Sequence, residues 1–233
     1  MRRSDTREKV SKCEEELVSN FACYLDYFDD HPPFKIYQRE LHRETIRLRM
    51  LADVRRAIRS DEFIKSLHDT LRAWRVNRGA ELLSQEEISN RLRDPAIESK
   101  LARLEVFFID DPDLNGQEIA ESLWELISDE RFRIKSAANK IESSSKALHH
   151  LLPDLVPPID REYTRVFFHW HGPQFQYNPK EVFLDIFEGL LRIAKNVGDL
   201  GRYVTKQGWR TSRTKIIDNA IIGFCLKNEL HLS

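Results

Sequence analysis

Glycine is scarce in this chain of 233 residues, and its scarcity narrows the range of possible folds. The chain has eight glycines, of which three precede residue 188. Because glycine supplies most of the unusual backbone conformations found in sharp turns, the first 180 residues contain few flexible breaks. The sequence also has no glycine-rich loop that could cradle a phosphate, which argues against a nucleotide-driven enzyme.

Cysteine is also rare, and the three cysteines present do not form a disulfide framework. Cys13, Cys23 and Cys225 are odd in number and lack framework spacing, as is typical of a reducing compartment. The first ten residues, MRRSDTREKV, lack the apolar core of a signal peptide. No run approaches the roughly 20 apolar residues of a membrane span. We therefore expect a cytoplasmic protein that does not enter a membrane.

The chain has no large excess of either charge. Its formal net charge is -1, with 32% charged and 41% hydrophobic residues, which is typical of a soluble globular protein. No overall field therefore draws it to DNA or to an anionic membrane. Any contact with nucleic acid has to come from a local basic patch.

Apolar residues at steps of three and four dominate the chain and predict an all-α fold. The first such run covers residues 7–28 and stops before Pro32, since proline lacks the amide donor of a continuing helix. Further helices are expected over residues 36–59 and 61–74. We expect a single compact multi-helix domain. The alternative is two closely docked helical subdomains, an N-terminal part of residues 1–80 and a main domain of residues 81–233 that carries the candidate site.

Local capping signals predict where several later helices begin. Ser84 and Glu87 have the spacing of a capping box, and Asp94 precedes a proline at the first helical position. The helix that starts there is expected to end near Phe108. Other helices are expected after Gly116, from Asp129 through residue 141, and over residues 181–197 and 214–226.

Residues 111–116 match the first half of a calcium-binding loop, D-x-D-x-N-G. Such a loop needs a bidentate glutamate at its twelfth position, where this chain has Ser122. Asn115 instead stands where a helix cap would, with Glu118 at capping-box distance. We therefore interpret the segment as a capping loop and predict no calcium site.

Four histidines lie within 23 residues: His149, His150, His169 and His171. Neutral imidazole is a common zinc ligand, so this density raises the question of a metal site. Neighbouring positions on a helix point about 100° apart, however, so only one histidine of each pair can reach a given ion. Neither a cysteine nor an H-E-x-x-H motif lies nearby. We expect one packed and one exposed histidine in each pair, and no metal or other cofactor.

Two basic clusters could contact a nucleic acid, whose phosphates are neutralised by lysine and arginine. The arginines of residues 39–59 alternate with acidic residues, which is equally typical of a solvated face crossed by salt bridges. The second cluster combines an aromatic ring for stacking with hydroxyls and free amides at a helix start. Ordinary capping beside surface cations is its alternative interpretation. Its residues are Lys206, Trp209, Arg210, Arg213 and Lys215, around residues 211–214.

A serine run followed by a proline-rich turn carries a resemblance to a known family. Ser144 and Ser145 precede Lys146, and fourteen residues later the sequence Pro-Ile-Asp ends at Asp160. The serines lack a G-x-S-x-G context and are most simply interpreted as a helix cap. The order of lysine, turn and aspartate resembles that of helix-hairpin-helix DNA glycosylases over residues 120–170. Serines stand where the hairpin of that family has glycines.

The resemblance implies base-excision chemistry on DNA. Lys146, its pKa lowered by desolvation between helices, would attack the sugar carbon as an amine, and Asp160 would stabilise the developing positive charge. The target base would leave the stack and pack on Trp170, Phe168 or Trp209. Duplex DNA is then the expected partner. The residues expected to bind it are Ser144, Ser145, Arg161, Trp209, Arg210, Arg213 and Lys215.

Two alternatives stay open. In a structural interpretation, Asp160 caps the helix that follows it, and Lys146 extends its ammonium to solvent from a buried stem. In a second functional hypothesis, the chain is a non-catalytic helical protein that binds a protein partner through its amphipathic N-terminal helix. The balanced net charge favours this hypothesis, whereas the basic, aromatic cluster favours nucleic acid.

Overall fold

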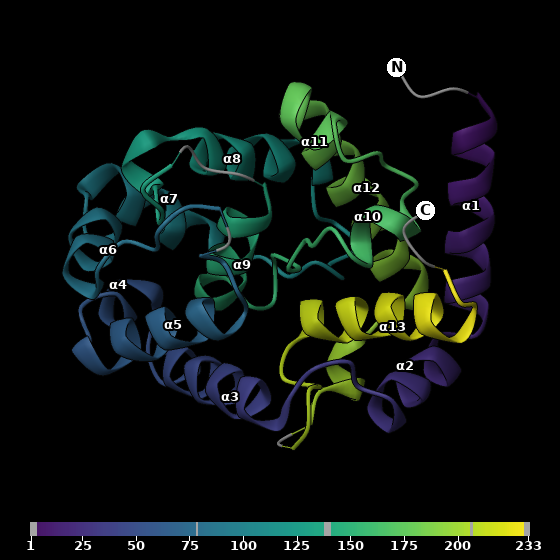
Figure 1. Ribbon diagram of the computed structural model, residues 1–233, viewed down its shortest axis with the longest axis horizontal. Helices are drawn as coiled ribbons and strands as arrows, with labels where there is room; N and C mark the ends of the chain where they lie inside the picture. Colours follow the sequence, from purple (N-terminus) through teal and green to yellow (C-terminus); the bar gives the residue numbers. More distant parts are fainter. Residues whose placement is uncertain (1–3, 78, 138–140, 206, 231–233) are drawn as a thin grey trace.

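The computed structural model describes residues 4–77, 79–137, 141–205 and 207–230 and confirms the all-α fold (Figure 1). Within these ranges the chain forms thirteen α-helices and two short 3-10 helices. The β contacts within the same ranges amount to one isolated antiparallel bridge, between Leu82 and Lys135. Among the described residues, none of the helices combines the length and hydropathy that crossing a bilayer requires.

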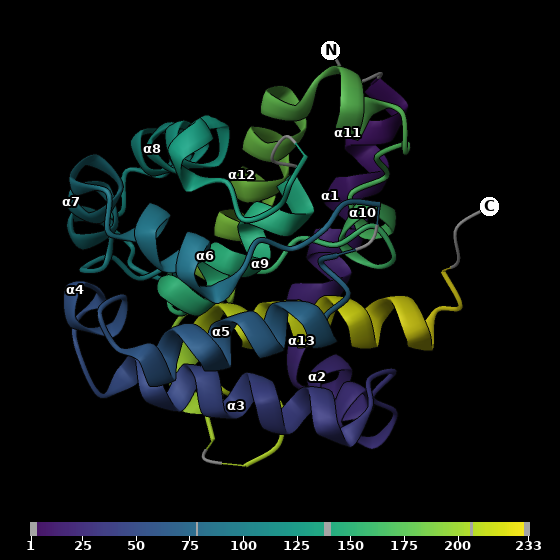
Figure 2. The same cartoon turned by 60° about the vertical axis from the view of Figure 1, so that its left-hand side comes forward.

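The helices pack as two groups around the central helix α9 (Ile141–Leu151) (Figure 1). In the first group, α3 and α5 lie side by side, as Figure 2 shows. The first group consists of α3 (Ile36–Met50), α4 (Val54–Ala57), α5 (Asp61–Ala73), α6 (Gln85–Leu92), α7 (Pro95–Leu104) and the 3-10 helix η1 (Glu130–Phe132). The second consists of α1 (Ser4–Ser19), α2 (Phe21–Asp30), α10 (Thr164–Phe167), α11 (Gln174–Tyr177), α12 (Pro179–Val197), η2 (Leu200–Tyr203) and α13 (Arg213–Lys227). Helix α8 (Gly116–Ser128) contacts α7, α9 and α12, and so connects the groups.

The two ends of the chain pack together through α2 and α13, which make a close helix–helix contact. Gly223 permits this approach, because a Cβ atom at that position would collide with the backbone carbonyl of Tyr24. Residues near both ends therefore share one core, while α3–α5 pack mainly on α6, α7 and α9. This packing does not follow the division at residue 80, which stays a prediction.

The capping signals in the sequence correspond to real helix starts. The Ser84 hydroxyl accepts a hydrogen bond from the Glu87 amide at 3.2 Å, and the Glu87 carboxylate accepts one from the Ser84 amide at 2.9 Å. Asp94 caps α7 ahead of the proline at its first position. Asn115 caps α8, which confirms that residues 111–116 contain a capping loop. These starts were predictable because each depends on side chains within one helical turn.

Two predicted helices are each broken into two. Residues 7–28 form α1 and α2, which are separated at Asn20, where the backbone leaves helical geometry. Residues 36–59 form α3 and α4, and the side chain of Asp53 caps α4 by accepting a bond from the Arg56 amide. The apolar period runs on through both breaks because the paired helices contribute to the same hydrophobic core.

The helix predicted from Asp129 to residue 141 is wrong. Asp129 caps only the single 3-10 turn η1, after which the chain is extended. The Ile134 carbonyl accepts a hydrogen bond from the Leu83 amide, and Lys135 forms the isolated bridge with Leu82. Pairing with this distant segment replaces the local helix. Residues 138–140, within the predicted span, lie outside the described residues.

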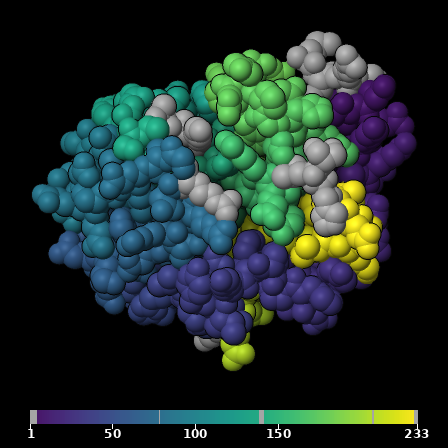
Figure 3. Space-filling model, viewed as in Figure 1, coloured from purple at the N-terminus to yellow at the C-terminus, as the bar shows by residue number. Residues whose placement is uncertain are grey.

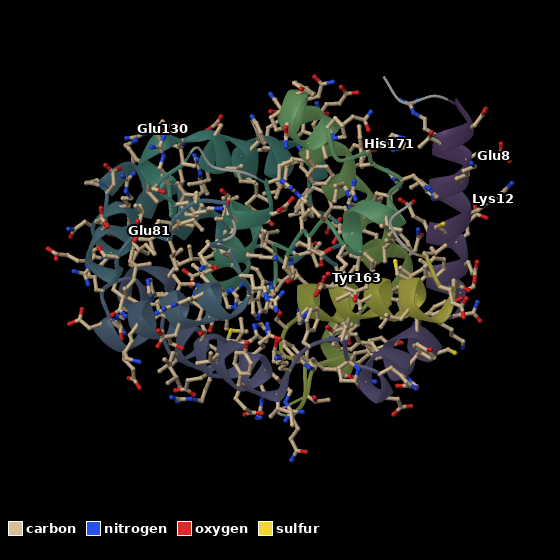
Figure 4. The ribbon with its side chains drawn as sticks, in the orientation of Figure 1. Glu8, Lys12, Glu81, Glu130, Tyr163 and His171 are labelled. Atoms are coloured by element: carbon tan, nitrogen blue, oxygen red, sulfur yellow. The ribbon has the colours of Figure 1, made fainter. Side chains whose placement is uncertain are left out.

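The amphipathic face of α1 is used inside the molecule. Val10 and Leu17 are buried, and the helix packs against α12 and α13. The carboxylate of Glu14 on the same side accepts hydrogen bonds from the Arg192 guanidinium on α12, at 2.8 and 3.0 Å. The exposed side carries the Glu8–Lys12 ion pair, which points away from the fold (Figure 4). A partner that binds α1 in this fold would therefore meet its polar face.

Candidate functional site

A cavity of about 630 Å³ lies between the two groups of helices. In the space-filling view, the surface is recessed between the blue residues of the first group and the green residues of the second (Figure 3). The cavity is large enough for a small organic ligand. Its lining comes from the α2–α3 connection, the loop after α5, α9, the turn before α10, and α13. The lining includes Phe34, Lys35, Trp74, Arg75, Lys135, Glu142, Lys146, Asp160, Arg161, Tyr163, Trp209, Lys215 and Asp218.

Lys146 and Asp160 both line this cavity. Lys146 projects from α9 and is partly exposed, and its ammonium has no ion-pair partner among the described residues. The chain then turns through Pro157 and Pro158 and returns beside α9. Ser145 fixes this return, because its hydroxyl accepts a hydrogen bond from the Ile159 amide at 3.0 Å. The turn therefore delivers Asp160 to the same cavity as the lysine.

Asp160 is held in place by its own backbone neighbours. Its Oδ1 accepts hydrogen bonds from the amides of Glu162, Tyr163 and Thr164, at 2.9, 2.7 and 3.3 Å. Its own amide donates to the Thr164 hydroxyl at 3.3 Å. The aspartate therefore organises the turn before α10 while facing the cavity. The N-cap position of α10 belongs to Tyr163, so Asp160 holds the preceding turn and does not cap the helix itself. Holding this turn is compatible with a role in the cavity.

Ser144 and Ser145 do not have the positions that the resemblance gave them. Both are fully buried inside α9, which begins at Ile141, so they neither cap this helix nor present a surface to nucleic acid. The prediction that they contact DNA and the prediction of a serine cap are both incompatible with this fold. Burial follows from the packing of α9 between the two groups, which covers nearly all of its sides. Residues 138–140, before the helix, lie outside the described residues.

Lys215 and Asp218 form a buried ion pair at the wall of the cavity. They stand one turn apart on α13, and the Lys215 ammonium donates to Asp218 Oδ2. Four aromatic rings surround the ammonium, at 5.1–5.8 Å from its nitrogen to their centroids. These are the rings of Phe28, Phe34, Trp74 and Trp209. Lys215 is therefore not the surface cation that the sequence suggested, since its side chain is 2% exposed.

The pKa of the Asp218 carboxyl is raised above its ordinary value. Burial raises the pKa of its carboxyl to about 6, the Lys215 ammonium acts in the opposite direction, and the charge of Asp160 adds to the rise. A carboxyl group that titrates near neutral pH inside a cavity is a common feature of functional sites. Neither Asp218 nor its aromatic surroundings stood out in the sequence.

The remaining cations of the predicted nucleic-acid cluster are occupied by carboxylates. Arg210 contacts Asp26 and Asp29, both at 2.6 Å, and Arg213 contacts Asp110. Arg161 is exposed beside the cavity and contacts Glu142. These side chains do not form one continuous basic surface. Lys206 lies outside the described residues.

Of the three rings expected to stack on a base, only Trp209 lines the cavity. Trp170 and Phe168 are buried elsewhere, and the Trp170 indole donates to Asp185 at 3.0 Å. Trp74, which sequence reasoning missed, supplies the second indole of the cavity. Tyr163 also lines it, and Figure 4 shows this residue over α13, well apart from His171.

The expectation of one packed and one exposed histidine is wrong for His149 and His150. Both are fully buried on α9, and His42 of α3 joins them as a third buried ring. His42 Nδ1 and His150 Nε2 share a hydrogen bond of 3.0 Å. His42 was not identified from the sequence, because it lies 108 residues from His150. Of the second pair, His169 is partly buried and His171 is exposed.

Comparison of the chain with protein-family models, with curated proteins and with solved structures gave no match.

Proposed function

We propose that the protein binds nucleic acid and accepts a base, turned out of its stack, in the cavity where Lys146 and Asp160 excise it. The observation that carries this proposal is that both side chains line one cavity with Trp74 and Trp209. An amine, a carboxylate and two indoles supply a nucleophile, a stabilising charge and apolar ring surfaces. A further candidate, binding of a protein partner through α1, has less support because the apolar side of α1 is buried.

The chemistry needs the substrate, water and two groups that line the cavity, Lys146 and Asp160. The Lys146 ammonium first gives a proton to water, and its amine then attacks the sugar carbon C1′ as the bond from C1′ to the base nitrogen breaks. The base leaves with that electron pair and takes up a proton from water, and the lysine nitrogen loses a proton to complete the new C–N bond. The C1′–O4′ bond of the sugar then breaks as the nitrogen lone pair forms the protonated imine, and O4′ takes up a proton to become a hydroxyl. The Asp160 carboxylate stabilises the positive charge that develops on the sugar. Its three backbone hydrogen bonds hold it in position for this role.

Positive side chains near the cavity support contact with the phosphates beside a bound base. Lys35 and Arg75 line the cavity, and both are exposed. Arg161 is a third exposed cation there, although it also contacts Glu142. Ion pairing with phosphates releases counterions, so the affinity for duplex DNA is expected to fall as salt rises. No binding, or binding that salt does not change, would contradict the nucleic-acid proposal.

Borohydride trapping on duplexes with modified bases tests the nucleophile. Wild-type protein is expected to form a covalent adduct, because borohydride reduces the imine between lysine and sugar. Lys146→Ala removes the amine and should abolish the adduct. Lys180→Ala is the matched control, since Lys180 is an exposed lysine paired with Glu121 outside the cavity lining. Equal trapping by wild type and Lys146→Ala would refute the assignment of Lys146.

A further inference from the structure

Three imidazole rings converge in the core between α3 and α9. They belong to His42, His149 and His150, and all three residues have 0% exposed surface. Their ring centroids are 5.1–5.4 Å apart in every pairing. One ring nitrogen from each lies within 4.8 Å of the other two. Two helices that are far apart in the sequence therefore bring three possible ligand atoms to one point.

The other nitrogen of each ring is held by a neighbouring oxygen. His150 Nδ1 donates to the Lys146 carbonyl at 2.7 Å, and His149 Nδ1 donates to the Val156 carbonyl at 3.0 Å. His42 Nε2 lies 2.7 Å from the Thr211 hydroxyl. Metal-binding histidines commonly have such a bond at the nitrogen that does not bind the ion, because it fixes the ring and its tautomer.

One ring nitrogen of these three histidines has no partner among the described residues. His149 Nε2 is buried and makes no hydrogen bond there. The hydrogen bond between His42 Nδ1 and His150 Nε2 provides one nitrogen of each of the other two rings with a partner. Leaving a polar atom buried without a partner costs free energy, so natural cores rarely keep one without a reason.

We propose that His42, His149 and His150 bind one divalent transition-metal ion, with Zn²⁺ as the first candidate. Imidazole nitrogen suits zinc and its neighbours in the first transition row. Tetrahedral zinc with Zn–N distances of 2.0–2.1 Å sets its nitrogens about 3.3 Å apart, so nitrogens that lie within 4.8 Å of one another have to approach further to bind it. Three protein ligands leave a fourth position to water.

The surroundings of the rings keep them in the form that binds metal. Burial lowers the pKa of His42 and of His149, and it lowers that of His150 to about 4. Burial therefore favours the neutral rings, and a neutral imidazole carries the lone pair that binds an ion. Lys215 contributes a nearby positive charge, which its partner Asp218 offsets.

Binding has a local consequence that can be observed. The rings of His42 and His149 are nearly parallel, at 16°, so His42 has to turn and give up its bond to His150. Trp209 stacks on His42 at 5.8 Å, and Trp74 stacks on His149 at 6.0 Å. Both indoles line the cavity, so an ion would fix the wall that they form. This site does not depend on the chemistry proposed for Lys146.

The test is a titration of chelator-treated wild-type protein with Zn²⁺ and Co²⁺. We expect one ion per chain by elemental analysis, visible cobalt absorption typical of nitrogen ligands, and a change in tryptophan fluorescence. His149→Gln should weaken the binding by about tenfold or more, since it removes the unpartnered nitrogen. His171→Gln, at an exposed histidine outside the cluster, should bind as wild type does.

Each outcome decides the proposal. One tightly held ion that His149→Gln loses and His171→Gln keeps supports it. Wild-type protein without a bound ion overturns it, as does equal binding by His149→Gln. If His149→Gln does not fold, its binding measurement is replaced by the thermal unfolding of wild-type protein with and without Zn²⁺. A rise in Tm with zinc that His171→Gln shares then supports the site, and an unchanged Tm overturns it.

Discussion

The ammonium of Lys215 donates to the carboxylate of Asp218 one turn later on α13, where both side chains are almost fully buried. Two charges removed from water depend on each other, because either alone would be left unsolvated. The same pair lines the cavity that holds Lys146 and Asp160. It therefore links the stability of the core to the candidate site.

Removing one partner of this pair should be costly. Asp218→Ala leaves the Lys215 ammonium buried and unpaired, and we expect it to lower the free energy of unfolding by about 3–5 kcal/mol. Lys65→Ala breaks the exposed Lys65–Asp69 pair of α5 and should have a much smaller effect. Urea unfolding followed by circular dichroism measures both. A loss for Asp218→Ala no larger than that for Lys65→Ala would contradict the account of the pair.

The raised pKa of Asp218 predicts a dependence of stability on pH. Between its ordinary value of 3.8 and about 6, the folded state holds the proton more tightly than the unfolded state. The contribution of this group is therefore full below pH 4 and is lost as the pH rises through 6. Relative to Asp218→Asn, wild-type protein should lose about 2–3 kcal/mol of unfolding free energy across this window. A difference that is constant from pH 4 to 6 would show that the pKa is not raised.

The buried histidines predict the opposite slope. The pKa of His150 falls from 6.5 to about 4 on burial, so the folded state resists protonation. Its contribution is full above pH 6.5 and is lost as the pH falls through 4. Between pH 6.5 and 4, the unfolding free energy of His150→Gln should decrease less than that of wild-type protein. The unfolding free energy of His171→Gln, changed at an exposed site, should decrease as much as that of wild type. Unfolding curves at several pH values, in the presence of a chelator, measure the difference.

The close packing of α2 on α13 predicts a strong effect at Gly223. An alanine there places its Cβ against the backbone of Tyr24, which cannot move aside without separating the helices. We expect Gly223→Ala to destabilise the protein by about 1–3 kcal/mol. Gly116→Ala is the control, because its nearest neighbour is the mobile end of the Leu191 side chain. Equal unfolding midpoints for the two variants would contradict this packing.

The sequence predicted features that depend on neighbours within a turn or two. The Ser84 capping box and the Asn115 cap are of this kind, and the structure contains both. The sequence could not predict which residues are buried, because burial depends on contacts between distant segments. The serines at 144 and 145 look like a cap by themselves, and only the packing of α9 shows that they are inside the core.

The residues of the candidate site also fall into two classes, those that local sequence order predicts and those that only distant contacts reveal. The local order of lysine, proline turn and aspartate indicates Lys146 and Asp160, and both line the cavity. Trp74, Asp218 and His42 were missed, because each becomes prominent only beside residues far along the chain. Isolated polar and aromatic residues carry no periodic signal, so sequence patterns cannot single them out.

The most direct measurement of the central claim is single-turnover release of a modified base from duplex DNA by wild type and Asp160→Asn. Asparagine keeps an oxygen for the amides of Glu162 and Tyr163 but removes the negative charge. The account predicts that wild type releases the base. It also predicts that Asp160→Asn keeps the wild-type Tm within a few degrees and releases the base about 100-fold more slowly or worse. No release by wild type, or equal rates for the two proteins, would contradict it.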